Sequence, residues 1–326
     1  MKKFLTCILA IAISLLSFSV FANNYAIIVD AGSTGSRLHI FQYTESAMPV
    51  ITDVFSNHTE PGLSSYSNQP EQAANTLKES LDKAVEFLKK NGVDNMSSVK
   101  ISILATAGMR LVPEDQQKAI YDNITQYIKN HYAFSISDIK TISGQMEGLY
   151  GWMDVNYLLG NFQNNKPTVG SIDMGGASTQ IAFATQNSVN PDDKISVNIN
   201  NQKYSVFSAS FLGLGQDQAR NAMETYGAAS ACYPKNATFG GTKVGNFNIV
   251  GCDDAYINVI QNQHIAQQIP PTAGQPSFYA YSGIYFTYHF FHADQQPADA
   301  DSINLKIHDV CSESWEILKN RKSDYS

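Results

Sequence analysis

Two segments of the chain carry an aspartate at the end of an apolar run, followed by a turn rich in Gly, Ser and Thr. They are AIIVDAGSTGSRLHIFQY, with Asp30, and TVGSIDMGGASTQIAF, with Asp173. Apolar runs of about four to eight residues predict strands, so both carboxylates are expected at strand ends. The alternation of apolar and polar residues after each turn predicts the returning strand of a hairpin. Carboxylates suit a divalent cation, and successive N–H groups in such a turn bind anions.

This hairpin unit has two interpretations, an ordinary turn or a phosphate-binding turn, and its repetition favours the second. A single Asp-x-Gly hairpin is explained by turn geometry alone, because glycine supplies the backbone conformations that tight turns need. A second hairpin of the same composition, far along the chain, is what two lobes facing a phosphate chain and its cation require. We therefore predict that the two turns lie opposite each other and bind a polyphosphate.

Apolar periodicity predicts the elements that must position these turns. A strand at Val99–Leu104 places Thr106 where strand becomes loop, and Ser143 can cap a helix with Glu147 in its first turn. The polar stretch Asn161–Lys166 is the expected domain boundary. The remaining predicted elements are helices at Glu71–Lys90, Glu114–Asn130 and Gln216–Tyr226, and strands at Lys194–Asn198 and Lys203–Ser208. The segment SFYAYSGIYFTYHFF fits either a core element or a surface on which a nucleobase stacks.

The first residues are expected to be a secretory targeting segment. Lys2 and Lys3 precede an apolar run from Phe4 to Val20, and small residues around Ala22 suit cleavage there. A retained membrane anchor is the alternative, although polar residues interrupt this short run. We predict no other membrane insertion, and two domains for the remaining length. The net charge of −7 argues against a nucleic-acid polymer as partner, but leaves room for a small phosphate ligand.

The cysteines indicate an oxidising compartment, secreted or periplasmic. Cys7 leaves with the targeting segment, and Cys232 and Cys252 flank a Gly-rich loop. We expect a disulfide between these two, with free buried thiols as the alternative, and Cys311 is left over. Three cysteines without clustered histidines do not make a zinc site. The histidines, such as His39, are expected to be structural or solvated.

Five segments, in the same order, resemble the motifs of the apyrase family, the nucleoside triphosphate diphosphohydrolases. These are VDAGSTGSRLHIF, ATAGMRL, SGQMEGLYGWMDVNYLLG, IDMGGASTQIAF and YAYSGIYFTYHFF. The resemblance implies a two-lobed α/β fold like that of actin, hexokinase and Hsp70-type ATPases (RNase H-like), with the active site between the lobes. After the targeting segment at 1–22, it implies a first lobe at 23–165 with the catalytic Glu, a second lobe at 166–290, and a C-terminal segment at 291–326 that returns toward the first lobe.

The resemblance also implies a role for each matching residue. Glu147 corresponds to the general base that activates water, and Ser178 and Gln180 complete the catalytic group. Asp30, Thr106 and Asp173 would hold Mg²⁺ or Ca²⁺ through water. The phosphate-binding residues would be Gly32, Ser33, Thr34, Gly35, Ser36, Arg37, Ala107, Gly175, Gly176 and Ala177, and Tyr279, Tyr281 and Tyr285 would contact the base.

These roles agree with the chemistry of phosphoryl transfer, which depends on positioning and on electrostatic stabilisation of the transferred group. Structural alternatives exist for several residues. Glu147 could complement the helix dipole, Ser178 and Thr106 could be capping or turn hydroxyls, and Arg37 could form a surface ion pair.

The expected function is secreted, cation-dependent hydrolysis of the terminal phosphate of nucleoside tri- and diphosphates, by a protein for which we favour a monomer. Two alternatives stay open, an exopolyphosphatase-like enzyme and a catalytically silent nucleotide-binding protein. Relatives continue beyond CSESWEILKNRK with an aromatic segment and a further cysteine, so the resemblance implies that the partner of Cys311 lies in a tail that this sequence lacks. It further implies that this form is less stable or less active than longer relatives.

Overall fold

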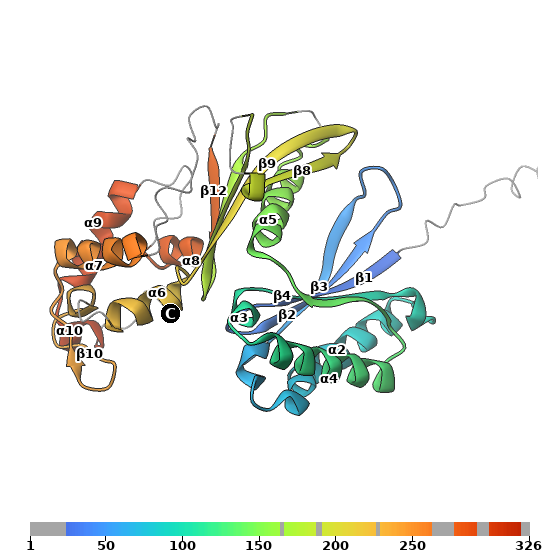
Figure 1. Cartoon of the computed structure of the whole chain (residues 1–326), viewed down its shortest axis with the longest axis horizontal. Coiled ribbons are helices and arrows are strands. Elements are labelled where there is room, and N and C mark those ends of the chain that lie inside the picture. Colours follow the sequence, from blue (N-terminus) through green and yellow to red (C-terminus); the bar gives the residue numbers. More distant parts are fainter. Residues whose placement is uncertain are drawn as a thin grey trace, which may run out of the picture.

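The computed structural model describes residues 24–163, 166–186, 191–225, 229–262, 277–291 and 300–320. They form two lobes, each built on a five-stranded sheet with helices (Figure 1). The two-lobed α/β arrangement expected from the sequence is therefore confirmed. The predicted targeting segment with its cleavage point at Ala22 lies outside the described residues.

The first sheet has the strand order β3-β2-β1-β4-β5. Strand β1 pairs antiparallel with β2 and parallel with β4, and Asp30 stands opposite Arg37 near the β1–β2 turn. The first predicted hairpin is thus present, with its aspartate one residue before the end of β1. The strands are β1 (Asn24–Ala31), β2 (Ser36–Tyr43), β3 (Ile51–Thr59), β4 (Lys100–Ala105) and β5 (Ser135–Thr141).

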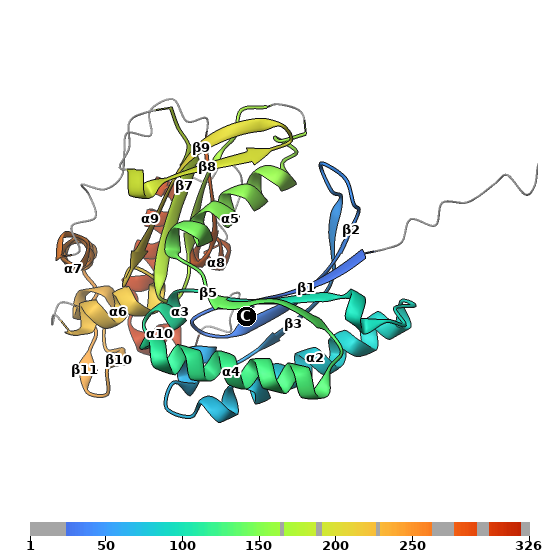
Figure 2. The ribbon, with the colours of Figure 1, turned by 45° about the vertical axis from the view of Figure 1, so that its right-hand side comes forward.

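Two long helices, α2 (Ala73–Lys90) and α4 (Glu114–His131), cover one face of this sheet (Figure 2). Alternate residues of β1, namely Ile27, Val29 and Ala31, are fully buried beneath them, as the period of two in a strand requires. Glu71, expected to begin α2, lies in a short 3-10 turn before it. The short elements of this lobe are η1 (Leu63–Tyr66), η2 (Pro70–Gln72), η3 (Met96–Ser98) and α3 (Ala107–Arg110).

The second sheet repeats the local topology of the first. Its order is β12-β6-β7-β9-β8, and β6 pairs antiparallel with β7 and parallel with β12, just as β1 pairs with β2 and β4. Asp173 stands near the end of β6, opposite Gln180. The second predicted hairpin is therefore present as well. The strands are β6 (Gly170–Met174), β7 (Ser178–Ala184), β8 (Lys194–Ile199), β9 (Gln202–Leu212) and β12 (Phe278–Ser282).

Helix α5 (Gly144–Leu158) packs against strands β6, β7 and β9 of the second sheet. Trp152 of this helix forms edge-to-face contacts with Phe162 and Tyr204, which are buried with it. Glu147 was expected within the first lobe, yet the helix that carries it belongs by packing to the second. Residues 164–165 of the predicted boundary lie outside the described part of the chain.

The rest of the second lobe surrounds the ends of β6 and β12. The aromatic-rich segment becomes β12 followed by α8, so it is both a strand and a helix. Helix α6 ends at Thr225, and Tyr226, with which it was expected to end, is not among the described residues. The remaining elements are η4 (Pro191–Asp193), α6 (Gln216–Thr225), η5 (Ala229–Cys232), β10 (Thr238–Phe239), β11 (Lys243–Val244), α7 (Ile249–Asn262), α8 (Gly283–Phe290), α9 (Ala300–Cys311) and α10 (Trp315–Leu318).

The C-terminal helices lie against the second lobe (Figure 1). The backbone N–H of Trp315 donates to the Lys235 carbonyl at 2.8 Å, and the ring of Phe247 meets that of His308 at 6.2 Å. The sequence interpretation expected this segment to return toward the first lobe. In the described residues its contacts are instead with the loops around β10 and β11, because main-chain pairing at Lys235 holds it there.

The predicted disulfide between Cys232 and Cys252 is present, and Cys311 has no cysteine partner among the described residues. It closes a loop with a sequence separation of 20 that contains β10 and β11. Replacing both cysteines by serine is expected to lower the free energy of unfolding by about 3 kcal/mol, from the chain entropy of a loop of this length. Urea denaturation of both proteins measures this difference, and equal transition midpoints would contradict it.

No helix in the described part of the chain is both long enough and apolar enough to cross a membrane.

Candidate active site

The two hairpin turns face each other across a cavity of about 520 Å³ between the lobes. They come so close that a Cβ added to Gly176 would lie 2.7 Å from the Ser33 hydroxyl. The sequence prediction that the turns lie opposite each other is confirmed. The cavity is lined by Asp30, Gly32, Ser33, Thr34, Arg37, Thr106, Ala107, Glu147, Asp173, Met174, Gly175, Gly176, Ala177, Ser178, Gln216, Asp217, Tyr281, Ser282, Gly283, Tyr285 and Phe286.

Four carboxyl groups line this cavity, and burial raises the pKa of three of them, Asp30, Glu147 and Asp173. The Arg37 guanidinium lies 3.5 Å from Asp30 Oδ2, and it and His39 oppose the effect of burial on the Asp30 pKa. Burial and the negative charge of Asp30 raise the Asp173 pKa. The buried Asp173 Oδ1 has no hydrogen-bond partner among the described residues. The site thus has more negative than positive charge, which a bound cation would compensate.

The donor atoms suit a hard cation that keeps part of its water shell. No three His, Cys, Asp or Glu side chains in the described ranges are grouped closely enough to ligate a metal directly. Carboxylates and hydroxyl groups are the ligands that Mg²⁺ and Ca²⁺ prefer, and Mg²⁺ usually retains several waters. The unpartnered oxygen of Asp173, with Asp30 and Thr106 on the same cavity, fits such a hydrated ion.

Glu147 is placed in the cavity by the start of α5. The Ser143 hydroxyl accepts the Met146 N–H at 3.2 Å and caps the helix, as predicted. The Glu147 Oε2 atom accepts from Arg110 Nη2 at 2.6 Å and from Gln180 Nε2 at 3.0 Å. Burial raises the pKa of Glu147 to about 7, although Arg110 acts in the opposite direction. A carboxyl group with this pKa can accept a proton near neutral pH.

Ser178 and Gln180 stand two residues apart on β7 and therefore on the same face of the strand. The Ser178 hydroxyl accepts from Arg110 Nη2 at 3.0 Å and from Gln180 Nε2 at 2.6 Å. Gln180 lies behind the cavity wall and also donates to the Ser210 hydroxyl at 2.8 Å. These contacts join Glu147 and Ser178 into one network that spans both lobes.

Some structural alternatives can now be compared with the geometry. Thr106 precedes α3, but its side chain makes no capping hydrogen bond in the described structure. Arg37 faces both Asp30 and the cavity.

Gly35 and Ser36, predicted to bind phosphate, are not among the residues that line the cavity. A Cβ on Gly35 would lie 2.4 Å from His58 Nε2, so packing against β3 accounts for this glycine.

Aromatic residues of the β12–α8 segment form one wall. Tyr281 and Tyr285 line the cavity as predicted for base contacts, whereas Tyr279 does not. Phe286, which the sequence interpretation did not select, lines it too and is 65% exposed. An exposed aromatic ring beside a phosphate site is suited to stack on a nucleobase.

Several residues that line the cavity or contact its lining escaped sequence reasoning. Arg110 was visible in the ATAGMRL segment, as a cation one helical turn after Thr106. Ser282 lies at the point where strand β12 becomes helix α8, and Gln216 and Asp217 begin α6. Only the packing of α6 and α8 beneath the second turn brings these three to the cavity.

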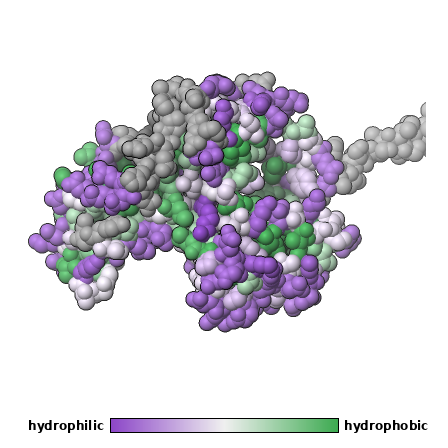
Figure 3. All heavy atoms as spheres, in the orientation of Figure 1, coloured by the Kyte–Doolittle hydropathy of each residue, from purple (hydrophilic) through white to green (hydrophobic). Residues whose placement is uncertain are grey.

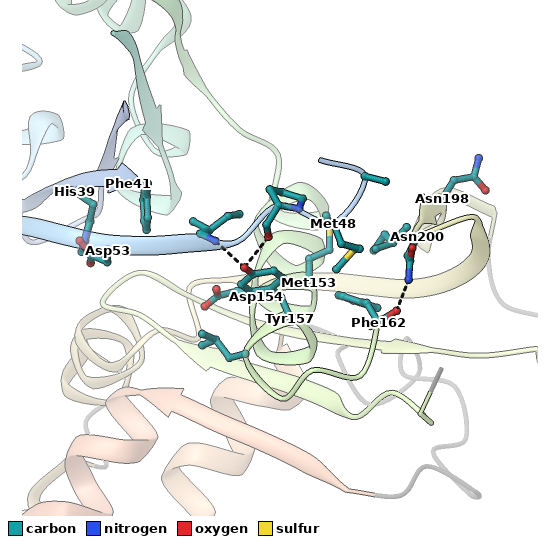
Figure 4. A pocket seen from close by; sticks show the side chains of 15 residues that line it. His39, Phe41, Met48, Asp53, Met153, Asp154, Tyr157, Phe162, Asn198 and Asn200 are labelled. Carbon is teal, nitrogen blue, oxygen red and sulfur yellow. Dashed lines mark hydrogen bonds and ion pairs between the residues drawn. The ribbon is translucent and has the colours of Figure 1, made fainter. Parts of the chain in front are cut away.

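A second cavity, of about 750 Å³, lies between α5 and the β2–β3 hairpin (Figure 4). Apolar residues gather where α5 faces the β2–β3 hairpin (Figure 3). The Tyr157 hydroxyl accepts the Ile51 N–H and donates to the Pro49 carbonyl, each at 2.8 Å, and so ties the lobes together here. His39 bonds Asp53 at 2.7 Å, which agrees with the structural role expected for it.

The position of Glu147 depends on glycines in α5. A Cβ at Gly148 would lie 2.5 Å from the Ser208 hydroxyl, which donates to the Gln145 carbonyl at 2.8 Å. We expect Gly148→Ala to push the helix away from β9, at a cost of about 1 to 3 kcal/mol in stability, and to lower turnover. Removing the hydroxyl in Gly148→Ala/Ser208→Ala should restore part of both. Denaturant midpoints and turnover of the two variants test this, and an uncompensated double variant would contradict it.

The sequence and fold were compared with known proteins. The model of the GDA1/CD39 (nucleoside phosphatase) family matches residues 20–234. The Golgi apyrase of Saccharomyces cerevisiae is 39% identical over 236 residues, which cover 61% of this chain and 37% of that protein. The guanosine-diphosphatase of Schizosaccharomyces pombe is 36% identical over 213 residues, covering 62% of this chain and 38% of that protein.

The ectonucleoside triphosphate diphosphohydrolase 5 of Bos taurus is 30% identical over 334 residues, covering 91% of this chain and 74% of that protein. This chain therefore spans well under half of the two yeast relatives and about three quarters of the bovine one.

Solved structures share the fold. A nucleoside triphosphate hydrolase from Neospora caninum covers 93% of this chain with a TM-score of 0.56 and 17% identity, and the match spans 73% of that protein. The PPX-GPPA enzyme of Aquifex aeolicus covers 85% of this chain with a TM-score of 0.50 and 14% identity, over 74% of its own length. The expected actin-like, two-lobed arrangement is thus confirmed.

Proposed function

Because the chain belongs to the GDA1/CD39 nucleoside phosphatase family, we propose that it hydrolyses the terminal phosphate of nucleoside tri- and diphosphates. The cavity between the hairpin turns supports this proposal. It brings together two Gly-rich turns that would bind phosphate, carboxyl groups that would hold a cation, and exposed aromatic rings, all on one surface. The names of the relatives, an apyrase and a guanosine-diphosphatase, point to the same substrate class.

One observation carries the mechanism: the carboxyl group of Glu147 and the hydroxyl of Ser178 share the Arg110 guanidinium at the same cavity wall. A water molecule held between the two could give its proton to Glu147 while its oxygen attacks the terminal phosphorus. The turns at Ser33 and Gly176 would hold the phosphate oxygens through backbone N–H groups. In-line attack of positioned water is the main requirement of this reaction, because its transition state is loose.

Asp30, Asp173 and Thr106 would hold the cation through its water shell. When bound, Mg²⁺ or Ca²⁺ supplies positive charge that balances the charge of the phosphate oxygens. Arg37, beside Asp30, is placed to contribute to the same charge balance.

We further propose that the protein works in an oxidising compartment, outside the cytosol. The Cys232–Cys252 disulfide supports this, because disulfides persist where glutathione and thioredoxin do not reduce them. The targeting segment predicted from the sequence agrees with it.

Phosphate release from ATP, ADP, GDP and UDP, with Mg²⁺ and with EDTA, tests the proposed function. We expect release from at least one nucleotide and its loss on chelation. Preferred hydrolysis of inorganic polyphosphate would favour an exopolyphosphatase-like enzyme. Such an activity would leave the exposed Phe286 without a role, because inorganic polyphosphate has no base to stack on it. Nucleotide binding without any phosphate release would show a silent binding protein and contradict the proposal.

A further inference from the structure

We propose that Ser282 is a positioning residue whose hydroxyl holds the Asp173 carboxyl group in the orientation needed to bind the hydrated cation. This inference rests on the proposed function and adds a residue to its machinery. The argument starts from the backbone of Ser282, which adopts a conformation that serine rarely takes.

Ser282 has φ 54° and ψ −125°. Positive φ values bring the Cβ of a non-glycine residue too close to its own backbone and are therefore unfavourable. Among the described residues, the other non-glycine residues with positive φ are Asn200, Asn201 and Asn236. Asparagine tolerates this region, because its side chain bonds the local backbone, whereas serine is less suited to it. Ser282 is therefore an outlier, and it lies at the candidate active site.

The surrounding structure forces this conformation. Strand β12 runs parallel to β6, with Tyr281 opposite Asp173 and Ser282 opposite Met174. At the next residue, a Cβ on Gly283 would lie 2.8 Å from the Met174 carbonyl oxygen and 2.6 Å from Gln216 Nε2. The corner between β12 and α8 is therefore pressed against the end of the strand that carries Asp173.

The Ser282 side chain lies at the cavity beside Asp173 and does not cap the helix that follows. Ser282 occupies the N-cap position of α8, where serine normally accepts a hydrogen bond from the helix, yet its side chain makes no such bond in the described structure. Ser282 and Asp173 instead line the same cavity, where the Ser282 side chain acts to lower the Asp173 pKa. Since Asp173 Oδ1 has no partner among the described residues, that oxygen stays available for the cation's water.

Replacing Ser282 by glycine separates the hydroxyl from the backbone strain. Ser282→Gly removes the hydroxyl and relieves the positive φ, while Ser282→Ala removes the hydroxyl and keeps the strain. If the hydroxyl positions Asp173, both variants should need about tenfold more Mg²⁺ for half-maximal phosphate release. Ser282→Gly should also melt at or above the temperature of the unchanged protein.

Two measurements besides turnover complete the test. Calorimetric titration of Mg²⁺ into the protein saturated with the non-hydrolysable analogue AMP-PNP should show a dissociation constant raised by about tenfold in both variants. The matched control is Asn201→Gly, which relieves a positive φ of 62° in the turn between β8 and β9. It should raise the melting temperature without changing the Mg²⁺ dependence.

The inference would be overturned if Ser282→Gly needed no more Mg²⁺ for half-maximal phosphate release and bound Mg²⁺ with unchanged affinity. The hydroxyl would then have no part in binding the cation. Failure of the proposed function looks different. In that case the unchanged protein releases no phosphate from any nucleotide, with or without Mg²⁺.

Discussion

Glu147→Gln is expected to lower turnover by a factor of about 10² to 10⁴, the usual contribution of a positioned general base. Glutamine keeps the size and the hydrogen-bonding capacity of the side chain, but its amide cannot accept a proton from water. The structure places this carboxyl group at the cavity, with 16% of its side chain exposed and a pKa near neutrality, about 7. Steady-state phosphate release from a nucleoside diphosphate measures the effect.

The control for this variant is Glu79→Gln, at an exposed position of α2 that pairs with Lys83. It should keep full turnover. Binding of AMP-PNP to Glu147→Gln should stay within a few-fold of the unchanged protein, because the carboxyl group serves the attacking water and not the nucleotide. Turnover that survives the Glu147 substitution would exclude this residue as the base.

Arg110→Met is expected to lower turnover at pH 7 by about 5- to 500-fold, because a nearby cation shifts a carboxyl pKa by about 1 to 3 units. Arg110 favours the ionised form of Glu147, so its removal raises the Glu147 pKa above about 7. More of the base is then protonated and inactive at neutral pH. The acid limb of the pH–rate profile should therefore move to higher pH, with part of the activity recovered near pH 9.

The pH profile separates this electrostatic effect from a loss of structure. Arg110→Lys keeps the positive charge but cannot donate to Glu147 and Ser178 in the same forked geometry, so its acid limb should move less. Lys78→Met, which removes an exposed ion pair with Asp82, is the control and should leave the profile unchanged. An Arg110→Met profile with the same acid limb, only lower in height, would contradict the proposed coupling.

Much of the local structure followed from sequence patterns, because these patterns act over a few residues. The apolar run, the Asp-x-Gly turn and the alternation after it specify a hairpin, so both hairpins and the strand-end positions of Asp30 and Asp173 were predictable. The Ser143 cap and the Cys232–Cys252 disulfide were also predicted from local signals, the first by a helix start and the second by cysteine spacing in an oxidised chain.

The positions of residues contributed by distant segments were not predictable in the same way. The apolar faces of α5 could have packed on either sheet, and the structure shows them on β6, β7 and β9. The same is true of the C-terminal helices, which contact Lys235 and its surroundings in place of the first lobe.

Sequence alone thus established the two turns, their carboxylates and the helix start that carries Glu147. Folding added Arg110 as the link between Glu147 and Ser178, the exposed Phe286 and the strained Ser282 beside Asp173. The physical reason is the distance along the chain over which each effect acts. Turn, cap and strand preferences depend on neighbouring residues, whereas these three side chains come to the cavity or to the residues that line it only because elements far apart in the chain pack together.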